Sequence, residues 1–250
     1  MRFMAPNPRL FAKIIGALAN IVSETNFVAS PEGLRVRAMD ESRVMLIEVD
    51  LPREFFYEYE CDQEEKLGVN LTDINKLLKK TKSSDTIEMI SEKGQLKLVI
   101  QGEIKRSFSF PILSLAGEEI PELSIPMKVN AKVVSSALKR AVTEASLMGE
   151  ILRFEASVDN LDELKTYTRS ERGEATFIFS RDSGSLLSLE VEENSKAGYG
   201  INYLEDIVKT ADAAETANIQ FSTDAPIKIE FELEGGGKIR YYLAPRVESA

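Results

Sequence analysis

Hydrophobic residues recur with the period of an α-helix in a few segments of the chain. In residues 8–22, Leu10, Phe11 and Ile14 begin a stripe that leaves Arg9 and Lys13 on the opposite side. This spacing is typical of a helix that packs one face on a core and exposes the other to water. The segments with this pattern are 8–22, 71–80, 133–142 and 201–209.

Between these segments, hydrophobic residues alternate with polar residues, as they do in strands with one face in water. Residues 104–112 and 227–233 show the alternation most clearly. Turn-forming residues such as Gly235, Gly236 and Gly237 separate the strands. We therefore expect the α+β class, with antiparallel sheets that carry a pair of helices on one side.

The same order of elements occurs twice. Residues 71–79 align with residues 201–209 without a gap, and residues 96–100 return as residues 227–231. Two copies of one supersecondary pattern predict two domains of similar fold, produced by tandem duplication. We expect an N-terminal domain at 1–113 and a C-terminal domain at 128–250.

Residues 114–127 have the composition of an interdomain connector. Prolines, a glycine and acidic residues in this region resist both helix and inner strand. The region nevertheless holds several hydrophobic residues, which is unusual for a simple tether. Packing of the connector on the surface of both domains would explain them.

Composition restricts the possible locations of the protein. The chain has 250 residues, 43% of them hydrophobic, which is enough to build ordinary cores. No hydrophobic stretch approaches the roughly 20 residues that a membrane-spanning helix needs, and no secretory signal is evident. We expect a soluble, cytoplasmic protein with no membrane partner.

The residue inventory argues against most kinds of catalysis. The chain has no histidine and a single cysteine, and it contains no phosphate-binding or dinucleotide-binding glycine motif. We therefore expect no catalytic residues, no metal and no cofactor. A carboxylate-dependent, metal-activated hydrolase is the enzymatic alternative, but it requires two or three convergent acidic residues. Adjacent pairs such as Asp40 and Glu41 point in opposite directions on an extended chain.

A formal charge of −10 argues against binding to DNA, but the charges are not evenly distributed. The hydrophobic stripes of the four helical segments leave lysines and arginines on the exposed faces, and the strongest cluster is in residues 76–82. Aromatic residues are not interleaved with these cations, and no helix offers a set of base-reading side chains. The pattern predicts sequence-independent contacts to phosphates.

The C-terminal segment Tyr241-Tyr242-Leu243-Ala244-Pro245-Arg246 carries the most specific resemblance. Together with residues 33–44 and 69–79, it is similar to sliding clamps of the proliferating cell nuclear antigen (PCNA) family, and most closely to their archaeal branch. The resemblance covers essentially the whole chain. Residues 159–173 depart from it, because they are longer and more charged than the family pattern, and their role is open.

This resemblance implies a DNA-clamp fold that assembles as a trimeric, pseudo-six-fold ring around duplex DNA. The helices would line the central hole, and the sheets would form the outer wall. The expected DNA-binding residues are Lys13, Lys76, Lys79, Lys80, Lys139, Arg140 and Lys209. An interaction scaffold that closes a ring without encircling DNA is a further alternative, which the basic helix faces disfavour.

The resemblance also implies that edge strands join the subunits. The strand near Lys105 would pair with the strand near Ala175 of the next subunit, and Lys105 or Arg106 would face Glu174 or Asp182. The expected interface residues are Lys105, Arg106, Phe108, Phe110, Ala175, Phe177 and Phe179. The edge strands could pair with those of an identical chain or of a close relative. The chain could therefore form a homotrimer or be one subunit of a heterotrimer, and both alternatives stay open.

Partner proteins would dock in a hydrophobic pocket on the outer surface. The expected pocket residues are Met39, Val44, Leu46, Leu123, Ile125, Pro226, Tyr242, Ala244 and Pro245. By resemblance, the ligand is a short peptide motif with a glutamine, an aliphatic residue and two aromatic residues. The partners implied are DNA polymerase, flap endonuclease, DNA ligase and the clamp-loader ATPase, and the location implied is the nucleoid.

Overall fold

The computed structural model describes residues 1–115, 120 and 123–246. The chain divides into two compact units, the first made of Met1–Pro121 with Leu233–Ile239 and the second of Glu122–Glu232 with Arg240–Ala250. Part of the connector expected at 114–127 lies outside the described residues, so the domain boundaries at 113 and 128 stay a prediction.

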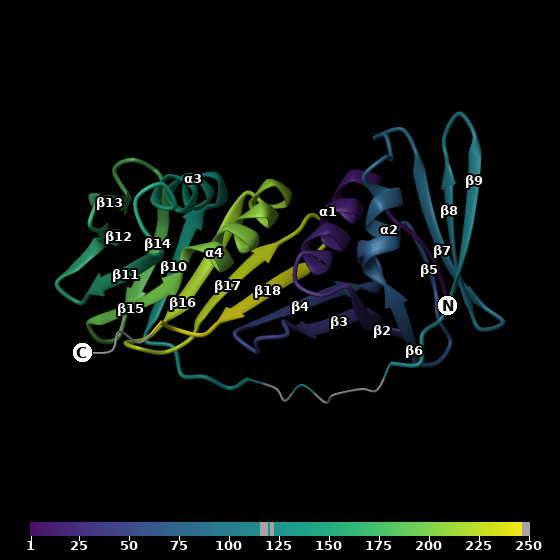
Figure 1. Ribbon diagram of the computed structural model, residues 1–250, viewed down its shortest axis with the longest axis horizontal. Coiled ribbons are helices and arrows are strands. Elements are labelled where there is room, and N and C mark those ends of the chain that lie inside the picture. Colours follow the sequence, from purple (N-terminus) through teal and green to yellow (C-terminus); the bar gives the residue numbers. More distant parts are fainter. Residues whose placement is uncertain (116–119, 121–122, 247–250) are drawn as a thin grey trace. The chain divides into compact units, whose positions relative to one another are not determined.

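The first unit combines two helices with antiparallel sheets. Its elements are β1 (Arg2–Met4), α1 (Pro8–Ala19), β2 (Glu24–Ser30), β3 (Gly33–Met39), β4 (Met45–Pro52), η1 (Arg53–Phe55), β5 (Glu58–Glu60), β6 (Glu65–Asn70), α2 (Leu71–Leu78), β7 (Thr86–Glu92), β8 (Gln95–Gln101) and β9 (Lys105–Pro111). One sheet has the order β5-β1-β7-β8-β9, and the other contains β4-β3-β2-β6. Helices α1 and α2 lie side by side, as Figure 1 shows.

The second unit repeats this order of helices and strands. Its elements are β10 (Val129–Val134), α3 (Ser135–Ala145), β11 (Ile151–Ser157), β12 (Asn160–Ser170), β13 (Gly173–Ser180), β14 (Leu186–Val191), β15 (Ser195–Gly200), α4 (Ile201–Val208), η2 (Lys209–Ala213), β16 (Thr216–Phe221), β17 (Ile227–Glu232) and β18 (Lys238–Leu243). One sheet has the order β13-β12-β11-β15, and the other contains β14-β10-β16-β17-β18. Helices α3 and α4 pack together. The α+β class and the duplication are both confirmed.

Asparagine side chains fix the start of both helices in the first unit. The Asn7 side chain accepts hydrogen bonds from the N–H groups of Arg9 and Leu10, at 3.0 and 3.2 Å. Asn70 accepts one from the N–H of Asp73, at 3.0 Å. These caps satisfy backbone donors that have no partner inside a helix. Phe11, Ile14 and Ile74 of the predicted core-facing stripes are buried, with 1% exposure or less.

The prediction for the third helix was wrong at its start. We expected a helix over 133–142, but Val133 and Val134 belong to β10, and α3 begins at Ser135. Both valines are β-branched, which favours a strand, and they continue its alternating burial. At the end of the strand, the Val134 N–H donates to the Ser185 carbonyl. The predicted ends at 22, 80 and 209 also lie one to three residues beyond the ends of the helices.

Residues 233–237 form the turn that the three glycines predict. The N–H of Leu233 donates to the carbonyl of Gly237 at 2.7 Å, and Gly235 and Gly236 have φ angles of 83° and 82°. Side chains with a Cβ atom rarely adopt these angles, so glycine is required here.

Candidate nucleic-acid interface

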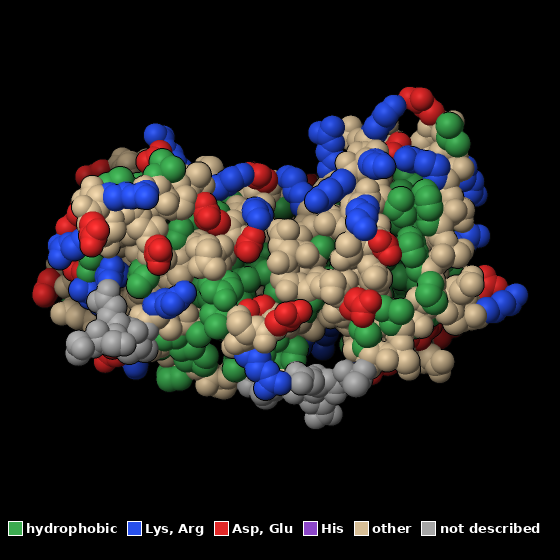
Figure 2. Space-filling view, in the orientation of Figure 1, with side chains coloured by type: hydrophobic (Ala, Val, Ile, Leu, Met, Phe, Trp, Pro, Cys, Tyr) green, Lys and Arg blue, Asp and Glu red, His purple; other side chains and the backbone are tan. Residues whose placement is uncertain are grey.

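The first unit presents a basic surface on its two helices. Burial of the hydrophobic stripes turns Lys13 of α1 and Lys76 of α2 outward, together with Lys79 and Lys80 just after α2, and all four are exposed. Figure 2 shows Lys and Arg side chains gathered over α1 and α2. Lys76 lies 3.3 Å from Asp73, whereas Lys79 and Lys80 form no ion pair with any residue that the structure describes.

The corresponding cations of the second unit are neutralised by neighbouring carboxylates. Lys139 lies 2.6 Å from Asp212, and Lys209 lies 2.5 Å from Asp206. Arg140 lies 2.7 Å from Glu144, and this hydrogen bond raises the pKa of the Arg140 guanidinium. In Figure 2, basic and acidic side chains alternate over α3 and α4. The two units therefore differ in the positive charge that their helices offer to an anion.

These surfaces suit weak contacts to phosphates. The cations are exposed and stand on helix faces, and exposed ion pairs such as Lys139–Asp212 contribute about 0–1 kcal/mol each. A phosphate can therefore replace a carboxylate partner at low cost. Contacts of this kind do not depend on base sequence and weaken as salt concentration rises.

The strands expected at subunit contacts lie at sheet edges. Strand β9 ends the five-stranded sheet of the first unit, and β13 ends the four-stranded sheet of the second. On β9, Lys105 is exposed while Arg106, Phe108 and Phe110 are half-buried. On β13, Ala175 and Phe177 are half-buried and Phe179 is 2% exposed. Unpaired N–H and C=O groups on such edges can join a strand from another chain.

Two of the charged residues expected to set the register of these edges have partners within their own unit. Arg106 lies 2.8 Å from Asp85, whose side chain is 4% exposed. Glu174 lies 2.7 Å from Arg169. Lys105 and Asp182 remain available to set the register between subunits, because neither forms an ion pair with a residue that the structure describes.

A rigid turn carries the first group of expected docking residues. The Asp40 carboxylate accepts hydrogen bonds from the N–H groups of Val44 and Met45, at 2.8 and 2.7 Å, and from the Ser42 hydroxyl. Burial acts against ionisation of Asp40, but these hydrogen bonds outweigh it and lower the pKa of Asp40. Met39 and Val44 are half-buried beside the turn, whereas Leu46 belongs to the core, with 2% exposure.

The second unit carries the remaining docking residues. Leu123 is 38% exposed. The half-buried residues are Ile125, Pro226, Tyr242, Ala244 and Pro245. Each group is placed within its own unit, so a single pocket formed by both groups stays a prediction.

The connector begins at a close contact that sequence reasoning missed. Leu113 forms an antiparallel bridge with Gly68 of β6, and its N–H donates to the Gly68 carbonyl at 2.9 Å. A Cβ atom at residue 68 would lie 2.1 Å from the Leu113 carbonyl oxygen. Glycine is therefore required at this point of β6. In the sequence, an isolated glycine within a strand pattern was the feature that could have indicated this close backbone contact.

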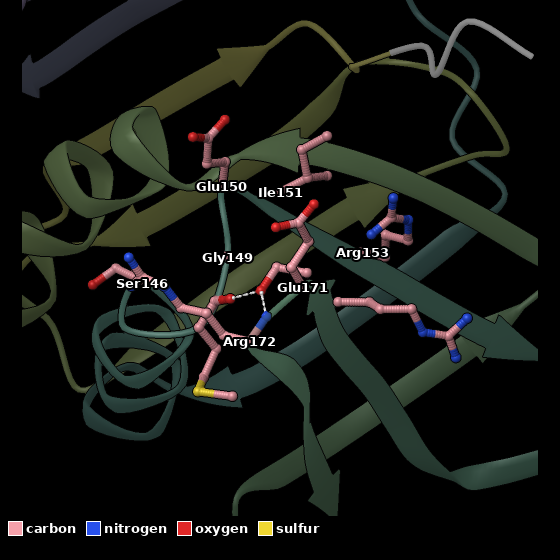
Figure 3. A pocket seen from close by; sticks show the side chains of 10 residues that line it. Ser146, Gly149, Glu150, Ile151, Arg153, Glu171 and Arg172 are labelled. Carbon is pink, nitrogen blue, oxygen red and sulfur yellow. Dashed lines mark hydrogen bonds between the residues drawn. The ribbon is translucent and has the colours of Figure 1, made fainter.

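A cavity of about 570 Å³ in the second unit was also missed. The loop 146–150, the start of β11 and the turn between β12 and β13 enclose it, as Figure 3 shows. Its charged residues include Arg153 and Glu171, and the Ser170 hydroxyl donates to the Met148 carbonyl at 2.5 Å. In the sequence, the many charged residues of 159–173 were the feature that could have pointed to this cavity. This stretch forms β12 and the turn that leads into β13.

The described part of the chain contains neither a candidate metal-binding cluster nor a helix that could cross a membrane. Its Asp, Glu and Cys residues nowhere gather in a group of three or more that could hold a metal ion. None of the helices in residues 1–115 and 123–246 is long and hydrophobic enough to cross a membrane.

Comparison with family models gives two matches. Residues 4–113 match the N-terminal domain of proliferating cell nuclear antigen, and residues 173–246 match its C-terminal domain. The curated relatives include proteins named DNA polymerase sliding clamp. The one from Thermofilum pendens is 39% identical over 99% of this chain and 100% of its own length. The one from Thermococcus onnurineus is 35% identical over 95% of each chain.

Solved structures of similar fold agree with these matches. The PCNA2-PCNA3 complex from Sulfolobus tokodaii contains a chain with a TM-score of 0.92 and 28% identity, covering 99% of this chain and 100% of that one. PCNA from Thermococcus kodakaraensis also has a TM-score of 0.92, with 30% identity, covering 98% and 99%.

Proposed function

Since the chain belongs to the proliferating cell nuclear antigen family, we propose that it is a DNA polymerase sliding clamp that encircles duplex DNA and catalyses no reaction. The observation that carries the proposal is the presence, in both units, of a helix pair whose exposed faces hold the basic residues. A ring lined by such helices holds DNA by topology, and its weak phosphate contacts allow the ring to slide.

Within this function, the first unit makes most of the phosphate contacts. Lys79 and Lys80 form no ion pair within the described residues, so a phosphate interacts with the full positive charge of each lysine. Lys139, Arg140 and Lys209 each have a carboxylate neighbour that a phosphate must displace. Lys13 and Lys76 complete the surface that faces the DNA.

The ring closes by antiparallel pairing of β9 with β13 of the next subunit. In an antiparallel pair, residues that stand opposite each other point to the same face. A register that places Phe108 opposite Phe179 and Phe110 opposite Phe177 also brings Lys105, the first residue of β9, to the level of Asp182 in the turn after β13. Opposite charges and matching aromatic residues on one chain favour pairing between identical subunits, and therefore a homotrimer.

One subunit of a heterotrimer is the second candidate. The PCNA2-PCNA3 complex from Sulfolobus tokodaii is a structure of two different clamp chains, which supports this alternative. Light scattering on the purified chain distinguishes the two, since a homotrimer forms without any other chain.

Replication and repair enzymes dock on the outer surface through a short peptide. The docking pocket combines Met39 and Val44 of the first unit with Ile125 and Tyr242 of the second. An extended peptide adds backbone hydrogen bonds along the connector at 114–127, while its hydrophobic side chains fill the pocket. DNA polymerase, flap endonuclease, DNA ligase and the clamp-loader ATPase are the partners proposed, and the nucleoid is the location.

Retention on DNA of different topology tests the function. The clamp is loaded by a clamp-loader ATPase onto nicked circular plasmid, one half of the sample is linearised, and both halves are washed with high salt. We expect the circular DNA to retain the protein and the linear DNA to release it from its ends. Equal retention on both forms would exclude encirclement.

A further inference from the structure

A cluster of cations lies on the outer face of the four-stranded sheet of the second unit, away from the helices. Lys165 of β12 and Lys196 of β15 place their ammonium nitrogens 5.0 and 5.4 Å from the centre of the Tyr167 ring. The guanidinium carbon of Arg153 on β11 lies 6.0 Å from the same centre. We call these three cations and Tyr167 the tyrosine cluster.

The register of the strands explains how three cations come to share one ring. Arg153 stands opposite Tyr167, and Glu155 stands opposite both Lys165 and Lys196. Because opposite residues in antiparallel strands share a face, all of these side chains project on the same side of the sheet. Tyr167 itself is 9% exposed, so the cations lie over its ring at the surface.

The two lysines of the cluster carry positive charge that their carboxylate neighbour does not offset. Glu155 lies between the two lysines in the register, yet neither ammonium forms an ion pair with it or with any other described residue. Attraction to the ring holds the cations near one another, and their mutual repulsion opposes this. An anion placed over the ring would relieve that repulsion. A surface of this kind is unexpected on a chain of charge −10.

The surroundings of the cluster indicate which anion it suits. Neighbouring strands are about 4.8 Å apart, so three strands offer cations over about 10 Å. Carboxylates border this area at Glu171 and Glu174 beyond one end of β12 and at Glu192 and Glu193 before β15. A long polyanion such as a DNA duplex would meet the carboxylates on both sides, whereas a short acidic segment that extends only towards Glu171 would not meet Glu192 and Glu193.

The cavity beside the cluster adds a second contact for such a segment. Arg153 belongs both to the tyrosine cluster and to the wall of the 570 Å³ cavity shown in Figure 3. A peptide whose carboxylate lies over Tyr167 can therefore place a neighbouring side chain in the cavity. We propose that the tyrosine cluster and this cavity bind an acidic segment of a partner protein, at a site separate from the hydrophobic docking pocket.

The test compares two pairs of lysines that carry the same charge. K165Q/K196Q removes two cations of the cluster, and K66Q/K97Q removes two exposed lysines from strands of the first unit. Both variants also carry K79Q/K80Q, so that the helix surface does not bind the probe. The probe is a fluorescein-labelled poly-aspartate peptide, with a poly-asparagine peptide as the uncharged control, and affinity is measured by fluorescence anisotropy on the assembled protein.

We expect K165Q/K196Q to weaken poly-aspartate binding about tenfold relative to K66Q/K97Q, as for the removal of two ion pairs. Poly-asparagine should bind neither variant. Equal affinity of the two variants for poly-aspartate would overturn the proposal. It would also fail if K165Q/K196Q bound a short DNA duplex or inorganic phosphate more weakly but bound the peptide as before. The result does not depend on whether the protein encircles DNA, because the peptide-binding assay contains no DNA.

Discussion

The hydroxyl oxygens of Thr210 and Tyr241 lie 2.6 Å apart inside the second unit, where Thr210 is 3% exposed and Tyr241 is 1% exposed. The Tyr241 ring also meets the ring of Phe231 edge to face, at 6.3 Å between centres. Because side chains alternate along a strand, Tyr242 projects to the other face of β18. The C-terminal tyrosine pair therefore consists of one core residue and one half-buried residue that can face a partner.

Replacing Tyr241 by phenylalanine should lower the free energy of unfolding by about 1–2 kcal/mol, because the Thr210 hydroxyl is left buried without its partner. Urea denaturation followed by circular dichroism measures the change. The control is Tyr57→Phe, at a tyrosine that is 76% exposed, and it should stay within about 0.5 kcal/mol of the wild type. Equal effects of the two substitutions would show that the buried hydrogen bond does not stabilise the unit.

Alkaline pH should destabilise the protein through its buried tyrosines. Burial raises the pKa of Tyr59, Tyr199 and Tyr241. A raised pKa in the folded state gives stability that is fully present below the unfolded value of about 10 and is lost as the pH rises above it. Ultraviolet titration of the native protein should therefore show these three of the seven tyrosines ionising late, together with unfolding. Ionisation of these three tyrosines near pH 10 without unfolding would contradict this assignment.

The two helix pairs should differ in their contribution to DNA binding. K79A/K80A should reduce DNA binding and polymerase stimulation more than K139A/R140A, because Asp212 and Glu144 already neutralise the second pair. The slope of log affinity against log salt should fall by about 0.9 for each phosphate that the variant no longer neutralises. Both variants remove two charges per chain, and both should assemble normally. A larger effect of K139A/R140A would reverse the proposed ranking.

The register proposed for the ring can be tested by exchanging charges. K105E or D182K alone places like charges opposite each other across the β9–β13 contact, so each should shift sedimentation from trimer towards monomer. The combined variant restores opposite charges and should recover the trimer. If the double variant is no better than the worse single variant, these two residues are not opposite each other.

The docking pocket should depend on Ile125 of the connector and on Tyr242 of the C-terminal segment. I125A/Y242A removes hydrophobic surface worth about 25 cal/mol per Å² and should weaken the binding of several unrelated partner peptides together. Calorimetry with a partner peptide measures the change in affinity, and retention on circular DNA serves as the control that the ring is intact. Unchanged affinity would place the docking site elsewhere.

Periodicity predicted the elements well, because each helix and strand carries its own pattern of burial. It failed where two patterns meet, as at Val133 and Val134, since a β-branched pair fits either the end of a strand or the start of a helix. It also could not find interactions that depend on the fold. Asp212 lies 73 positions after Lys139, and the tyrosine cluster draws cations from three strands whose register no local pattern specifies.

The sheets that end in β9 and β13 are protected at their opposite edges. Strand β5 has three residues, two of them glutamates, and the N–H of Arg246 covers β15 by donating to the Gly198 carbonyl at 2.8 Å. Short, charged or covered edges resist pairing with other chains. A mutant whose subunits met at the wrong angle would therefore extend end to end through β9 and β13. Electron microscopy of such a mutant should reveal helical filaments instead of amorphous precipitate.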